Sequence, residues 1–191
     1  SITDYKLNTY VQISSYTNVN KSIILEAISL CDHYEHIFSR TLAASELYKV
    51  NNKETSIISD ELYELIETGL EYSRLSDGAF DITIGSVSRL WDFTSSVPDA
   101  SLISNALEYV DYTKVTLNTD TAGTHYIDMP DGFCIDLGAV AKGYIADKIK
   151  TFLVDNGVKS AIINLGGNVL CIGEKKKNTD FTIAVKKPFS D

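Results

Sequence analysis

Residues 136–173 read DLGAVAKGYIADKIKTFLVDNGVKSAIINLGGNVLCIG, and their pattern organises the rest of the chain. A short apolar run with a carboxylate, Asp136, near its end opens this stretch and is typical of a strand. Apolar residues at helical spacing follow, and Gly157 stands where a glycine commonly ends a helix. Two more apolar runs come next, separated by Gly166-Gly167. The predicted segments are a strand over 133–137, a helix over 139–156, and strands over 160–165 and 169–172.

The first two turns of the predicted helix hold small residues and one early lysine, Lys142. Small side chains let a ligand or another backbone come close. The free N–H groups of a helix start favour phosphate, whereas a lysine there is unfavourable unless an anion lies nearby. Two interpretations stay open: Lys142 binds an anionic ligand, or it pairs with Asp136 or Asp147 in an ordinary packed helix. The small residues are Ala139, Ala141, Gly143 and Ala146.

The pattern D-L-G-x-x-A-K-G-Y-x-x-D, followed by N-L-G-G-N, resembles the signature of the ApbE family, the FAD:protein FMN transferases. Further segments fit that family in the same order, and the resemblance covers about 7–188. These segments are Phe38-Ser39-Arg40, Ser45-Glu46-Leu47 with Asn51, and Asp77-Gly78-Ala79-Phe80-Asp81-Ile82-Thr83 followed by Leu90-Trp91.

The resemblance implies an enzyme that binds FAD with a divalent cation, usually Mg²⁺. It would move FMN onto a threonine hydroxyl of a target flavoprotein and release AMP, and some members also hydrolyse FAD. Ala139 matches a family position that reaches the metal, necessarily through its backbone carbonyl. The residues that match family positions at the FAD site are Leu7, Ala79, Phe80, Asp81, Asp136 and Lys142.

Other family features fall outside these residues. The family's remaining metal ligands, an Asp and a Thr, and its active-site histidine lie in a C-terminal portion, so the catalytic residue stays unassigned. His125, expected in a turn, does not match that histidine, and the usual Met-Gly-Thr start reads Leu7-Asn8-Thr9. We therefore expect residues 1–191 to form a single ApbE-like domain that lacks the C-terminal portion, transfers no FMN alone and is poorly soluble alone.

Charge and hydropathy narrow the possible partners. The 191 residues carry 17 basic and 26 acidic side chains, a formal net charge of −9. An acidic chain argues against nucleic acid or an anionic membrane as the main partner. No apolar run approaches the about 20 residues of a membrane-spanning helix. The resemblance implies an extracytoplasmic lipoprotein, with the membrane reached only through a lipid anchor of the parent protein.

Several polar residues allow both a structural and a functional interpretation. Asp81 lies in an apolar run, so its carboxylate either faces a ligand or caps local N–H groups. His33 and His36 are three residues apart, but two histidines without a third ligand are weak evidence for a metal. The cysteines are odd in number and form no C-x-x-C, so we expect buried thiols rather than disulfides or a zinc site. They are Cys31, Cys134 and Cys171.

The remaining periodicity predicts an α+β fold with antiparallel or mixed sheets and packed helices, T-fold-like as the resemblance implies. A Rossmann fold would need G-x-G-x-x-G directly after a first strand, and this chain has no such pattern. Three functions stay open: an FMN transferase, an FAD-binding or FAD-hydrolysing protein, and a non-enzymatic interaction domain. The other predicted elements are strands over 7–16, 115–117, 126–129 and 181–185, helices over 21–38, 59–76 and 98–109, and a loop with a short turn over 38–51.

Overall fold

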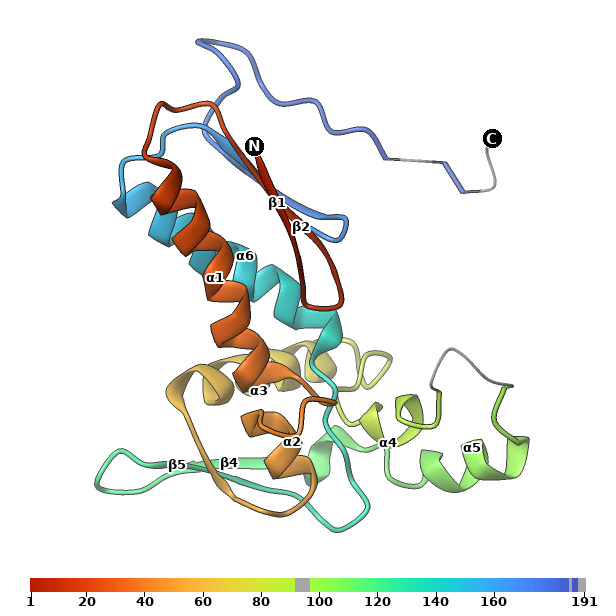
Figure 1. Ribbon diagram of the computed structural model, residues 1–191. Coiled ribbons are helices and arrows are strands. Elements are labelled where there is room, and N and C mark those ends of the chain that lie inside the picture. The colour runs from red at the N-terminus through yellow and green to blue at the C-terminus, as the bar shows by residue number, and fades with distance from the viewer. Residues whose placement is uncertain (92–96, 186, 189–191) are drawn as a thin grey trace. The chain divides into compact units, whose positions relative to one another are not determined.

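The computed structural model describes residues 1–91, 97–185 and 187–188 (Figure 1). The chain divides into two compact units. Unit 1 consists of Ser1–Asp32 and Ile145–Asp191, and unit 2 of His33–Tyr144. The single domain remains a prediction from the sequence.

Unit 1 contains a four-stranded sheet in which every neighbouring pair is antiparallel. Its strands follow the order β1-β2-β6-β7, so the first and last parts of the chain meet at β2 and β6 (Figure 1). Alternate residues of β2 and β6 are fully buried, as a half-buried sheet requires. The strands are β1 (Ile2–Lys6), β2 (Thr9–Ser15), β6 (Ala161–Leu165) and β7 (Asn168–Ile172).

Two long helices contribute to unit 1. Helix α1 spans Lys21–Phe38 and helix α6 spans Gly138–Asp155, both within one residue of the predicted bounds. Lys6 is tied to α1, because its ammonium lies 2.7 Å from the Asp32 carboxylate. The apolar stripes of the two helices within this unit are buried, which supplies the core against the sheet. Those buried residues are Ile24, Ala27, Ile28, Cys31, Ile145, Ala146, Ile149 and Leu153.

Unit 2 combines short helices with a three-stranded antiparallel sheet of order β3-β5-β4. Its longest complete helix, α3 (Asp60–Leu75), begins as predicted at Ser59, whose hydroxyl accepts the Leu62 N–H at 3.3 Å. The other elements are α2 (Glu46–Asn51), β3 (Ile57–Ile58), α4 (Gly85–Ser88), α5 (Ala100–Leu107), the 3-10 turn η1 (Tyr112–Lys114), β4 (Thr116–Thr119) and β5 (His125–Asp128).

The antiparallel sheets with packed helices confirm the predicted α+β class and differ from the parallel sheet of a Rossmann fold. Several local predictions were wrong. The loop expected over 38–51 contains α2, because Ser45 caps it by accepting the Tyr48 N–H at 3.2 Å. The strand expected over 7–16 is present as β2, but the sequence did not predict β1, which pairs with β2 through a turn at Leu7-Asn8. Residues 181–185 form no strand.

Candidate functional site

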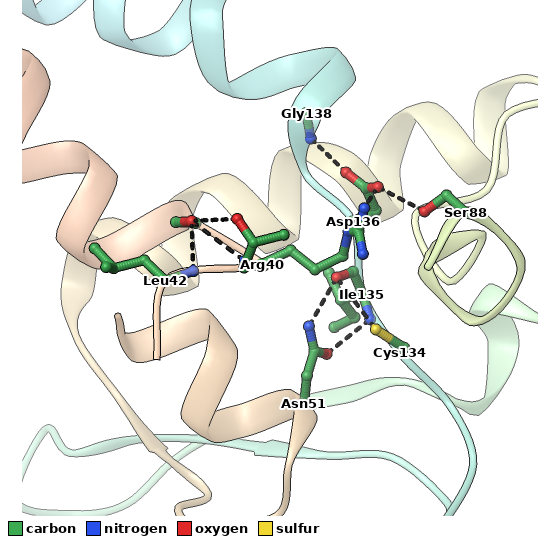
Figure 2. A network of polar contacts seen from close by, with 10 residues as sticks. Arg40, Leu42, Asn51, Ser88, Cys134, Ile135, Asp136 and Gly138 are labelled. Carbon is green, nitrogen blue, oxygen red and sulfur yellow. Dashed lines mark hydrogen bonds and ion pairs between the residues drawn. The ribbon is translucent and has the colours of Figure 1, made fainter. Parts of the chain in front are cut away.

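The segment before α6 was predicted as a strand, but it forms no named strand and is held by side-chain contacts together with isolated backbone contacts. Asn51 bonds both backbone groups of Ile135: its Oδ1 accepts the N–H at 2.8 Å and its amide donates to the carbonyl at 2.9 Å. The Asp136 N–H donates to the Ile82 carbonyl at 2.8 Å. Figure 2 shows Asn51 reaching this segment. An asparagine side chain therefore takes the place of a neighbouring strand.

A close backbone contact fixes the other side of the same segment. Ile84 and Cys134 form a single parallel bridge, the only strand-like pairing recorded for 133–137 within the described residues. A Cβ built on Gly85 would lie 2.4 Å from the Cys134 carbonyl oxygen, so no larger residue fits there. The Ser86 hydroxyl accepts the Cys134 N–H at 3.0 Å. The start of α4 is thus packed directly against the segment that carries Asp136.

The Asp136 carboxylate has three donors from three parts of unit 2. Its Oδ1 accepts the Gly138 N–H at 2.9 Å and so caps the start of α6. Its Oδ2 accepts the Ser88 hydroxyl at 2.8 Å and the Arg40 Nε–H at 3.1 Å (Figure 2). Both ion-pair partners are largely buried, with side chains 22% and 24% exposed. The cation beside Asp136 is therefore Arg40, and the alternative pairing with Lys142 is wrong.

The first turn of α6 is open to solvent. Gly138 and Ala139 are exposed and Lys142 is half-buried. Among the described residues, no ion pair is recorded for Lys142, so the alternative pairing with Asp147 is also not found. A Cβ built on Gly143 would meet nothing within 4 Å. An open helix start with a lysine lacking a protein anion fits a phosphate-bearing ligand.

Tyr144 anchors the unit 2 end of this helix. Its hydroxyl donates to the Glu64 carboxylate of α3 at 2.6 Å. Its ring meets those of Tyr34 and Phe38 edge-on, with centroids 5.8 Å and 5.4 Å away. Burial, followed by the Glu64 contact, raises the pKa of Tyr144 far above its usual range. The phenol therefore stays a neutral donor and fixes the turn that contains Lys142.

Asp81 caps local backbone, which is the structural interpretation of its position. Its Oδ1 accepts the N–H and the hydroxyl of Thr83 at 2.8 Å and 2.7 Å, and its Oδ2 accepts the Tyr112 N–H at 2.9 Å. These contacts shape the loop that precedes α4. Ala79 is exposed and Phe80 is half-buried in the same loop, so both remain accessible to a ligand. The predicted FAD contacts of all three residues stay predictions.

Leu7 belongs to unit 1, apart from the other predicted FAD residues, all of which lie in unit 2. It occupies the tip of the β1–β2 hairpin beside Asn8, and both residues have left-handed φ angles, 54° and 56°. This two-residue turn is usually made by Asn-Gly, because a left-handed conformation is unfavourable for a branched side chain. Leu7 is half-exposed in that position, and its contact with the flavin ring stays a prediction.

A complete metal shell is not assembled by the described side chains. No group of three or more His, Cys, Asp or Glu side chains within that part of the chain could hold a cation. His33 lies 3.6 Å from Glu61, which gives one carboxylate–imidazole pair. His125 begins β5, where a turn was expected, and its ring stacks on Tyr63 with centroids 4.1 Å apart. Ala139 could supply Mg²⁺ with one backbone oxygen. The described residues by themselves do not complete a magnesium site.

The cysteines are free thiols. Cys31 and Cys134 are buried, as predicted, whereas Cys171 is half-buried on β7. Burial raises the pKa of the Cys134 thiol, although the nearby guanidinium groups of Arg89 and Arg40 oppose this effect. The Cys134 thiol is therefore less readily deprotonated than an exposed one.

Three residues that build the site were not predicted from the sequence. Arg40, Ser88 and Asn51 all contact the segment from Ile135 to Asp136. Arg40 and Asn51 are part of the family motifs, so the signal was present, but the motifs do not say which partner each side chain has. Ser88 carries no sequence signal, because a serine near a helix end usually faces solvent.

Comparisons with known proteins give the family that this chain matches. Residues 7–191 match the model of the ApbE family. The FAD:protein FMN transferase of Klebsiella pneumoniae (strain 342) is 33% identical over 178 residues, which are 90% of this chain and 54% of that protein. The enzyme of the same name from Treponema pallidum (strain Nichols) is 31% identical over 159 residues, 78% of this chain and 44% of that protein. The chain spans about half the length of the curated relatives it matches.

Two solved structures share the fold. The ApbE protein of Thermotoga maritima superposes with a TM-score of 0.86 at 29% identity, covering 100% of this chain and 64% of that one. The flavin transferase ApbE of Vibrio cholerae gives a TM-score of 0.84 at 20% identity, covering 98% of this chain and 63% of that one.

Within the described residues, no helix is both long and apolar enough to span a membrane.

Proposed function

Because this chain belongs to the ApbE family, we propose that the protein carrying it is an FAD:protein FMN transferase whose FAD site includes the start of α6. One observation supports this most strongly. Half-buried Lys142 lies about one turn after the exposed start of α6, has no ion pair among the described residues, and follows the firmly held Asp136 by six positions. A diphosphate is the anion that such a cation and helix start accommodate.

The proposed reaction breaks the phosphoanhydride bond of FAD. The threonine hydroxyl oxygen of an acceptor flavoprotein forms a phosphoester with the FMN phosphorus, its proton is lost to a base or solvent, and AMP leaves with the other phosphate. Lys142 would neutralise charge on the diphosphate, and Asp136 would accept a hydrogen bond from an N–H or O–H of the ligand. A bound Mg²⁺ would supply additional charge neutralisation at the phosphates.

The other predicted site residues take supporting roles in this proposal. Ala79 and Phe80 are the accessible parts of a loop that Asp81 holds in shape. Leu7 would contact the flavin ring from its hairpin tip. Ala139 would give Mg²⁺ its backbone carbonyl, and the remaining ligands would come from the Asp and Thr that the family carries in its C-terminal portion.

We propose an extracytoplasmic location, with a lipid anchor on the parent protein. This proposal rests on the family pattern alone. Globomycin treatment, which blocks lipoprotein processing, should shift the mass of the protein in cells that produce its full gene. A fully cytosolic protein without a lipid-modified cysteine would contradict the proposal.

Equilibrium titration with FAD tests the binding part of the proposal. The full-length protein should bind FAD, and Lys142→Ala should weaken binding. Lys150→Ala is the matched control, because it removes the same charge from an exposed position of the same helix. Equal affinities of all three proteins would contradict the proposed site, and no FAD binding by the wild type would leave an interaction domain as the better interpretation. Release of AMP without a flavinylated acceptor would instead indicate an FAD hydrolase.

A further inference from the structure

We propose that Arg40 and Ser88 are positioning residues of the FAD site, which hold the Asp136 carboxylate in the orientation that receives the ligand. The inference rests on the proposed function, because it assigns Asp136 to the FAD site. Neither side chain has a role in the reaction proposed above. Both act through one oxygen of Asp136, with Oδ2 2.8 Å from the Ser88 hydroxyl and 3.1 Å from the Arg40 Nε.

The hydrogen-bond donors are distributed unequally over the two carboxylate oxygens of Asp136. An ionised carboxylate has about four acceptor positions, two on each oxygen. On Asp136, Arg40 and Ser88 occupy both positions of Oδ2, while Gly138 N–H occupies one position of Oδ1. Counting the contacts of the described residues, one acceptor position remains on Oδ1, the oxygen that bonds the N–H at the exposed start of α6. A ligand donor can bind there without displacing a protein contact.

The two donors also prevent the carboxylate from rotating. Arg40 follows the end of α1 and Ser88 ends α4, so the donors approach Oδ2 from separate elements (Figure 2). Any rotation of the carboxylate out of its present plane would lengthen both contacts and the bond from Gly138 N–H. The guanidinium is planar and charged, and its half-buried Nε–H makes a directional bond that a lysine cannot copy. Preorganised groups of this kind favour binding because little order must be gained when the ligand arrives.

The experiment measures FAD affinity of the full-length protein at a temperature where each variant is fully folded by thermal melting. Ser88→Ala should weaken FAD binding about two- to tenfold, the usual worth of one hydrogen bond. Ser88→Thr keeps the hydroxyl and should restore the affinity. Arg40→Gln, which removes a charged donor, should weaken binding at least about tenfold, and Arg40→Lys should restore it only in part.

A double-mutant comparison separates positioning from a direct or a purely structural role. In an Asp136→Ala background, Ser88→Ala should cause no further loss of FAD affinity, because no carboxylate remains to be oriented. If Asp136→Ala does not fold, Asp136→Asn serves as the background, and the effect of Ser88→Ala should then shrink. The control is Ser59→Ala, which removes the hydroxyl that caps α3 in unit 2 and should lower the melting temperature without changing FAD affinity.

Two results would overturn the inference. Ser88→Ala and Arg40→Gln could behave like Ser59→Ala, with lower melting temperatures and unchanged FAD affinity. Their losses could also add fully to that of Asp136, which would mean that they act independently. A wild-type protein that binds no FAD would instead refute the proposed function itself, and the titration of the wild type identifies that case before any variant is made.

Discussion

Replacing Lys142 by alanine should separate ligand binding from folding. The side chain is half-buried and has no recorded ion pair among the described residues. Its removal should therefore change the free energy of unfolding of the unliganded protein by no more than about 0.5 kcal/mol, as for an ordinary surface substitution. A lost hydrogen bond to a charged phosphate should weaken FAD binding by about 1.5–3 kcal/mol. That loss corresponds to a roughly ten- to hundredfold higher dissociation constant.

Asp136→Asn should behave differently, because its carboxylate is part of the protein's own structure. That carboxylate accepts hydrogen bonds from Arg40, Ser88 and Gly138. Asparagine leaves the half-buried guanidinium without its anion, so we expect a stability loss of about 1.5–3 kcal/mol together with weaker FAD binding.

Thermal and urea unfolding with and without FAD, combined with FAD titration, measure both effects. Saturating FAD should raise the melting temperature of the wild type and raise that of Lys142→Ala much less. Lys150→Ala should match the wild type in every measurement. A large melting loss in unliganded Lys142→Ala, with FAD affinity intact, would refute the reasoning, since it would mean that the lysine stabilises the fold.

Three further predictions concern the scaffold. Gly85→Ala should destabilise the protein by about 2 kcal/mol or more in urea unfolding, because the new Cβ would lie 2.4 Å from a backbone carbonyl oxygen; an unchanged midpoint would count against the close packing. The double substitution Leu7→Asn and Asn8→Gly should raise the free energy of unfolding by about 1 kcal/mol, since the new Asn and Gly both favour the left-handed turn. It should also weaken FAD binding, because the Leu7 side chain is lost. A lower melting temperature would show that the native turn is not strained. The hydrogen bond to Asp32 raises the pKa of Lys6 above 10.5, so the stability from this pair is present below pH 10.5 and is lost as the pH rises through the higher folded-state pKa. Urea midpoints measured at successive pH values should therefore fall less at high pH for Lys6→Gln than for the wild type. An equal fall in both proteins would contradict this contribution of Lys6.

The long helices could be predicted from the sequence because their signals are local. The apolar stripe of α1, the Ser59 cap of α3 and the closing Gly157 of α6 each lie within the element they define. Short elements were missed, since β1, β3 and α2 are stabilised by pairing and burial rather than by periodicity. The segment over 133–137 has a strand's composition, yet Asn51, 84 residues earlier, supplies the contacts of a neighbouring strand.

The candidate site, like the fold, could be predicted only where its sequence signal is local. A motif located Asp136 and Lys142, because both belong to one contiguous stretch of sequence. Their surroundings depend on contacts between distant residues: Arg40 reaches Asp136 across 96 positions and Ser88 across 48. No periodicity records such contacts. The alternative pairing of Lys142 with Asp136 was wrong for this reason, since the competing cation lies in a separate part of the chain.

The intact mass of an acceptor protein tests the central claim most directly. The full-length protein is incubated with FAD, Mg²⁺ and a threonine-bearing flavoprotein acceptor, with an acceptor lacking that threonine and the Lys142→Ala enzyme as controls. The account predicts that the acceptor gains the mass of FMN less one water, that one AMP is released for each FMN added, and that both controls abolish or strongly reduce the gain. An unchanged acceptor mass while FAD is bound or consumed would contradict the proposed transferase.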